Sequence, residues 1–73
     1  MSKAMEQIVQ VYVRHQNRRA LEDLRKHRQR LALELKAHAR PGYDFGAPMR
    51  QIDEEIAVIE VGLERLVIAA KAA

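Results

Sequence analysis

The chain contains no cysteine and no tryptophan, and its only aromatic residues are two tyrosines and one phenylalanine. Without cysteine it has neither a disulfide nor a thiolate zinc site to stabilise it. With so few aromatic residues, any core must be aliphatic, as in helix bundles. A chain this short buries only about 60% of its extended surface when it folds alone. We therefore expect one domain, residues 1–73, that gains stability by association with other chains.

Long apolar runs are also missing. The longest run near the C-terminus is LVIAA, residues 66–70, whereas a membrane-spanning helix needs roughly 20 apolar residues. The start of the chain, MSKAMEQ, lacks the basic region and apolar core of a secretory signal. We therefore expect no membrane span and a cytoplasmic location.

The sequence is poor in residues that carry catalytic or metal chemistry. Its one serine is Ser2, and it has no threonine or cysteine to act as a nucleophile. His15, His27 and His38 are 12 and 11 residues apart, whereas a helical zinc site uses histidines at i and i+4. The glycines form no phosphate-binding motif. We expect no enzymatic activity, no metal and no cofactor.

Proline and glycine are concentrated in one segment, RPGYDFGAP, residues 40–48, which is typical of a loop. Residues 3–39 contain neither and are rich in good helix formers. They predict a long first helix, either continuous or broken near Asn17. A proline suits the first position of a helix, so a second helix is expected over 48–72, after a loop at 40–47.

The second predicted helix carries an unbroken apolar heptad, the seam of a coiled coil or helix bundle. A short connection makes antiparallel packing of the two helices the natural fold, an all-α two-helix hairpin. Charge supports the pairing, because residues 1–40 hold ten Lys or Arg and four Asp or Glu (+6) and residues 41–73 hold three and six (−3). The predicted hairpin core consists of Leu24, Leu31, Leu35, Ile52, Ile56, Ile59, Leu63 and Leu66.

The two predicted helices differ in length, which leaves the segment IVQVYV, residues 8–13, beyond the end of the second helix. At 1.5 Å per residue the first helix would be roughly 55 Å long and the second roughly 37 Å. The β-branched residues of this segment also suit a strand, but an all-helical chain offers no sheet for it to join. We therefore expect a helical overhang without cover from its own chain.

The second predicted helix also has apolar residues on the face away from its seam, beside a mid-helix glycine that indicates close approach of another backbone. A two-fold homodimer that forms a four-helix bundle would cover both this face and the overhang. A different protein partner is the alternative. The predicted oligomer interface consists of Ile8, Val9, Tyr12, Val13, Val58, Val61, Gly62 and Ile68.

Positive charge is concentrated in RHQNRRALEDLRKHRQR, residues 14–30. Arginines on one helical face neutralise phosphates, so this face is a candidate for nucleic acid or an acidic partner. Glu22 and Asp23 interrupt it and no aromatic residues are interleaved, which favours a solvated, salt-linked surface. The candidate face consists of Arg14, Arg18, Arg25, Lys36 and Arg40.

Together these features predict a non-enzymatic module for protein–protein interaction or oligomerisation. The alternative is a small nucleic-acid-binding or regulatory protein. No motif in the sequence indicates a biological process or the identity of a partner.

Overall fold

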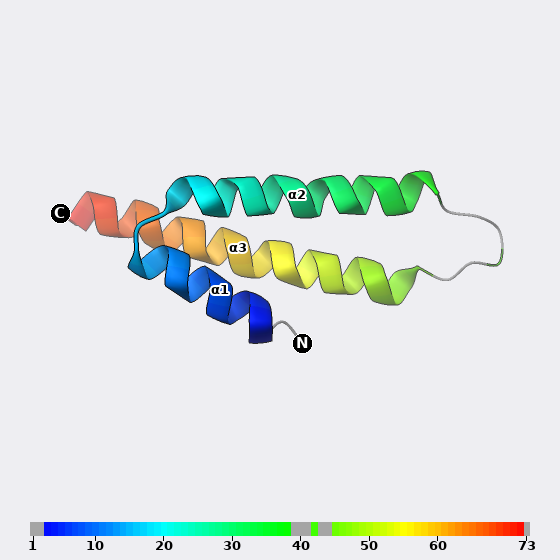
Figure 1. Cartoon of the computed structure of the whole chain (residues 1–73), viewed down its shortest axis with the longest axis horizontal. Helices are drawn as coiled ribbons and strands as arrows, with labels where there is room; N and C mark the ends of the chain where they lie inside the picture. Colours follow the sequence, from blue (N-terminus) through cyan, green and yellow to red (C-terminus); the bar gives the residue numbers. More distant parts are fainter. Residues whose placement is uncertain (1–2, 39–41, 43–44, 73) are drawn as a thin grey trace.

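The segment that the sequence presents as one long helix forms two helices. The computed structural model of the chain describes residues 3–38, 42 and 45–72. Within these residues the fold is all-α, as predicted, but it has three helices instead of two, α1 (Lys3–Arg14), α2 (Arg18–Ala37) and α3 (Gly46–Ala72) (Figure 1). None of the described helices is both long and apolar enough to cross a membrane.

The break between α1 and α2 is a tight turn at residues 15–17 with its own hydrogen bonds. Asn17 donates its backbone N–H to the Tyr12 carbonyl at 2.8 Å, and Gln16 donates its own to Val13 at 3.0 Å. This pair of bonds is the Schellman arrangement that satisfies carbonyls at a helix C-terminus. Gln16 takes the left-handed conformation that the motif requires, with φ of 54°. Asn17 then caps α2, because its Oδ1 accepts the Ala20 N–H at 3.2 Å.

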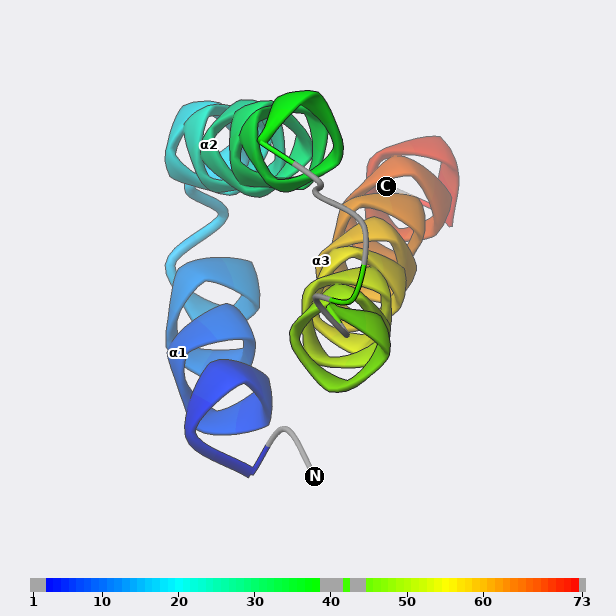
Figure 2. The ribbon, with the colours of Figure 1, turned by 90° about the vertical axis from the view of Figure 1, so that its right-hand side faces the viewer.

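The turn reverses the direction of the chain and corrects two predictions. The first helix is not continuous over 3–39, and the break near Asn17 is what the structure contains. Residues 8–13 do not project beyond α3, because α1 runs alongside α3 and parallel to it, while α2 runs antiparallel to both (Figure 1). Seen along the long axis, the three helices occupy the corners of a triangle (Figure 2).

The core lies where all three helices meet. Its buried members come from each helix, and partly buried side chains pack around them. The buried cluster consists of Met5, Val9, Leu21, Ile59 and Leu63, and the residues packed against it are Tyr12, Val13, Leu24, Val58 and Leu66. α1 therefore supplies its own apolar face to the core instead of leaving it for another chain.

The predicted hairpin core is buried to different extents. Ile52, Ile59 and Leu63 are buried. The remaining predicted residues are partly buried, and they are Leu24, Leu31, Leu35, Ile56 and Leu66. Three buried hydrophobic residues, Met5, Val9 and Leu21, lie outside that predicted set, and Leu21 has no exposed surface.

Leu21 was missed because the break changes the phase of the helical pattern. A single face drawn from α1 through the turn includes Gln16 and His27, and both are exposed. Read from Asn17 onward, α2 has its own heptad seam in steps of 3, 4, 3 and 4. That seam consists of Leu21, Leu24, Arg28, Leu31 and Leu35.

Arg28 is the one charged residue of the α2 seam, and it faces an acidic residue of α3. Its Nε lies 3.1 Å from Glu55 Oε1, and the two side chains are only 22% and 17% exposed. The buried Nε has no well-aligned hydrogen-bond acceptor among the described atoms. The contact is therefore mainly an electrostatic attraction between the two charges and not a directional hydrogen bond. This ion pair joins α2 to α3.

We expect the Arg28–Glu55 pair to contribute a measurable coupling energy to folding. In a double-mutant cycle with Arg28→Ala and Glu55→Ala, the coupling should be about 0.5–1.5 kcal/mol at low salt, because both groups are largely shielded from water. Urea denaturation of the four proteins provides the measurement. The same cycle on the exposed pair Arg18–Glu22 serves as the control and should give about 0.5 kcal/mol or less. Equal coupling in the two cycles would contradict this expectation.

Candidate functional site: the groove between α1 and α3

α1 and α3 approach most closely at Gly62. A Cβ atom on this residue would lie 2.5 Å from Val9 Cγ1 and 3.3 Å from Val13 Cγ2. Only glycine leaves room for contact this close. The close approach predicted for this glycine is therefore made by α1 of the same chain.

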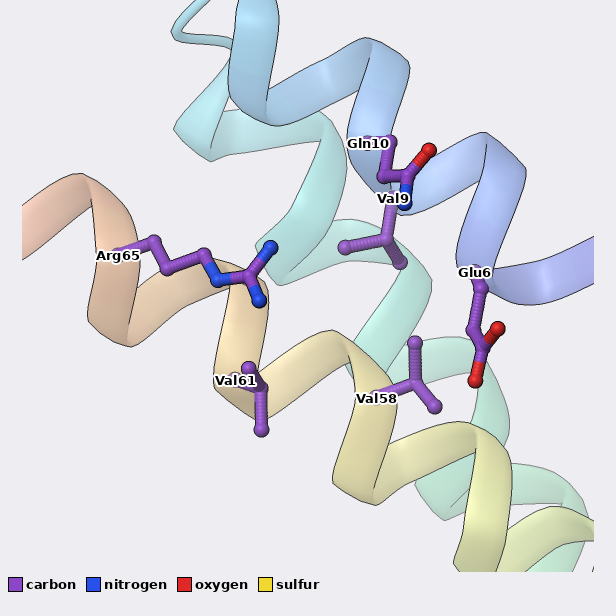
Figure 3. A pocket seen from close by; sticks show the side chains of 7 residues that line it. Glu6, Val9, Gln10, Val58, Val61 and Arg65 are labelled. Atoms are coloured by element: carbon purple, nitrogen blue, oxygen red, sulfur yellow. The ribbon is translucent and has the colours of Figure 1, made fainter.

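On the outer side of this contact the two helices leave a groove of about 350 Å³. α1 and α3 each supply one wall (Figure 3). The lining residues are Glu6, Val9, Gln10, Val58, Val61, Gly62 and Arg65. The groove therefore has valine and glycine at its centre and polar or charged side chains around it.

The two charged residues of the groove lie at its opposite ends. Glu6 lies over Val58 at one end, and Arg65 lies past Val61 at the other (Figure 3). Both side chains are exposed, and neither forms an ion pair or a hydrogen bond with another described residue. Each end of the groove thus has one unpaired charge, of opposite sign.

Apolar surface continues from the groove along the outer face of α3. Val61 is 49% exposed and Ile68, seven residues further on, is 58% exposed. This spacing puts them on the same side of the helix. Single exposed apolar residues are ordinary, but here two of them extend an apolar groove.

The predicted oligomer interface separates into two groups. Five of its residues are covered within the chain, and these are Val9, Tyr12, Val13, Val58 and Gly62. The expectation that they lack cover in their own chain is wrong, because α1 folds onto α3. The other three, Ile8, Val61 and Ile68, are exposed, and contact with another chain stays a prediction for them.

The predicted basic face is divided by the same turn. Arg14 lies on α1, whereas Arg18, Arg25 and Lys36 lie on α2. Arg18 and Lys36 are exposed, Arg25 is partly buried, and Arg40 lies outside the described residues. Arg18 pairs with Glu22 through Nε and Oε1 at 2.9 Å.

Three exposed basic residues of α2 were missing from the predicted face. They are Arg19, Lys26 and Arg30. They became evident only once the seam of α2 was known, because they lie opposite Leu21 and Leu24 when each position is turned by about 100°. The basic surface is therefore centred on the outer side of α2.

The described part of the chain does not present the arrangement that a metal site requires. Within residues 3–38, 42 and 45–72, no group of three or more His, Cys, Asp or Glu side chains is placed to hold a metal ion. His38 Nδ1 lies 2.8 Å from the Glu34 carbonyl oxygen at the end of α2, where it completes the helix cap. The groove has apolar groups at its centre and charges at its ends.

The chain matches no protein-family model, and no curated protein or solved structure is significantly similar to it.

Gly62 provides a test of this geometry. We expect Gly62→Leu to lower the free energy of unfolding by about 1–3 kcal/mol, the usual cost of overpacking, because its side chain meets Val9. Val9 is β-branched and has few rotamers with which to move aside. Urea denaturation followed by circular dichroism measures the change. Ala57→Leu, at an exposed position of the same helix, is the control and should change stability by no more than about 0.5 kcal/mol. Equal stability of the two variants would contradict the close contact.

Proposed function

We propose that this protein is a non-enzymatic, cytoplasmic interaction module that self-associates as a homodimer through the α1–α3 groove and the outer face of α3. One observation carries the proposal. Val61 and Ile68 remain 49% and 58% exposed although α1 and α2 both pack against α3. A third neighbour for α3 would remove this apolar surface from water.

The energetics of a small core favour such an association. Among the residues that the structure describes, the largest fully buried side chains are those of Leu21 and Ile59. Burial of further apolar surface contributes about 25 cal/mol per Å². Binding that occurs only in the folded state also adds to the stability of that state. A dimer therefore gives this chain a larger core than its own length allows.

The proposed interface has the form of a four-helix bundle. α1 and α3 of each copy would form one layer, and the layers would face each other with α2 on the outside. The heptad spacing of Val61 and Ile68 is the spacing that coiled-coil contacts use. Closed two-fold assemblies are the commonest kind of homo-oligomer.

We expect the wild-type protein to be a dimer by light scattering at micromolar concentration. The double variant Val61→Asp/Ile68→Asp should be a monomer with unchanged helix content by circular dichroism. Both positions are exposed in the single chain, so the fold tolerates a carboxylate there, whereas a dimer interface would bury unpaired charges.

Leu33→Asp is the matched control. Leu33 is 68% exposed on α2 and lies away from the groove, so this variant should remain a dimer. A wild-type monomer throughout the micromolar range would contradict self-association and would leave the groove to a different protein partner.

Nucleic-acid binding is the second candidate, and the exposed basic side of α2 supports it. Arg19, Lys26, Arg30 and Lys36 are all exposed, and none of them forms an ion pair with another described residue. Such a surface binds phosphates without reading the base sequence.

If this second function holds, a duplex of arbitrary sequence should bind at about 50 mM salt and bind much more weakly at about 200 mM, because binding releases counterions. Fluorescence anisotropy of a labelled duplex measures it. Lys26→Glu/Arg30→Glu should abolish binding while the matched variant Arg65→Glu, on the other side of the molecule, retains it. No binding at the lower salt concentration would exclude this function.

A further inference from the structure

We propose that the second copy docks on the α1–α3 groove in an antiparallel, two-fold orientation in which Glu6 of each copy pairs with Arg65 of the partner subunit. This inference rests on the proposed self-association and specifies its geometry. It follows from the two unpaired charges at opposite ends of the groove (Figure 3).

The distance between the two charged ends sets the register. Glu6 lies over Val58, and Arg65 is seven residues after Val58 on the same helix (Figure 3). Seven residues of helix correspond to about 10 Å. The two charges are therefore separated along the groove, with Val9 and Val61 between them.

A two-fold axis that runs across the groove, perpendicular to the helices, reverses the direction of the second copy. α1 then faces α1 and α3 faces α3. Glu6 and Arg65 extend over the groove from opposite walls (Figure 3), so each end of the groove receives the carboxylate of one copy and the guanidinium of the other. Because the contact is isologous, the same Glu6–Arg65 pair forms twice. Val61, the exposed valine of the groove, then lies close to Val61 of the partner subunit across the axis.

The other two-fold orientation lacks this match. A two-fold axis parallel to the helices keeps the two copies parallel. Arg65 of one copy then lies near α1 of the partner subunit, but at the end of the groove opposite to the end that holds Glu6. The opposite charges then stay about 10 Å apart along the helix, and salt screens them at that distance. Charge complementarity thus selects the antiparallel orientation.

Glu6 and Arg65 are tested by charge reversal. Glu6→Lys and Arg65→Glu should each weaken homodimerisation roughly tenfold, because each replaces two attractive pairs with two repulsive ones. The double variant Glu6→Lys/Arg65→Glu should return to within about threefold of the wild-type dissociation constant. Sedimentation equilibrium measures all four proteins.

Mixing the two single variants gives the most specific result. A Glu6→Lys chain and an Arg65→Glu chain should form a heterodimer as tightly as the wild type forms a homodimer, because both ends of the groove then hold opposite charges. Native mass spectrometry with one chain isotopically labelled measures the heterodimer fraction. If Glu6 paired with Arg65 of its own chain, mixing the two variants would not favour the heterodimer.

The controls separate this inference from the proposed function. Glu60→Lys and Arg30→Glu change charge at exposed positions outside the groove and should leave dimerisation unchanged. A wild-type dimer whose single groove variants dimerise normally and mix at random overturns the antiparallel pairing but not self-association. A wild-type monomer overturns both.

Discussion

The arrangement of the molecule depends on one steric constraint, the absence of a side chain at Gly62. Val9 of α1 occupies the space where a Cβ would lie. Without this space α1 could not seat against α3, and the apolar residues of α1 would lose their cover. The buried cluster then loses its contributions from α1, Met5 and Val9. A residue that contributes no side chain thus determines whether the third helix belongs to the fold.

The second constraint is the turn that directs α1 toward Gly62. Gln16 has the left-handed backbone conformation that usually favours glycine, and the two bonds from Gln16 and Asn17 to α1 compensate part of its cost. The contact between Val9 and Gly62 and the turn at residues 15–17 support each other, because the turn directs α1 toward Gly62 and the contact stabilises α1 in that position. Such agreement between local and tertiary structure is characteristic of a sequence with one stable fold.

Parts of the fold that depend on periodicity could be predicted from the sequence. The heptad of α3 correctly indicates Ile52, Ile59 and Leu63 as buried. The sequence left two interpretations open, a continuous helix or a break near Asn17, because a left-handed glutamine has no sequence signal. That one uncertainty displaced Leu21 from the predicted core and put Val9 and Val13 in a predicted interface.

The candidate site was harder to predict than the core. The sequence singled out Gly62 as a point of close approach, but the atoms that lie close to it are side-chain atoms of the same chain, from Val9, Val13 and Leu21. A groove between α1 and α3 depends on the reversal at residues 15–17, so neither Glu6 nor Arg65 could be singled out beforehand. Glu6 and Arg65 lie on different helices, so only the folded structure places them at the two ends of one groove.

The short length of α1 has a consequence for the dynamics of the fold. α1 has 12 residues and α3 has 27. One half of the molecule therefore contains all three helices, and the other half contains only α2 and α3 (Figure 1). Leu31, Leu35 and Ile56 in the thinner half are only partly buried. Local opening requires less free energy where fewer apolar contacts must break. Backbone amides near the loop should therefore exchange with solvent before those beside Gly62, and the molecule opens from one end.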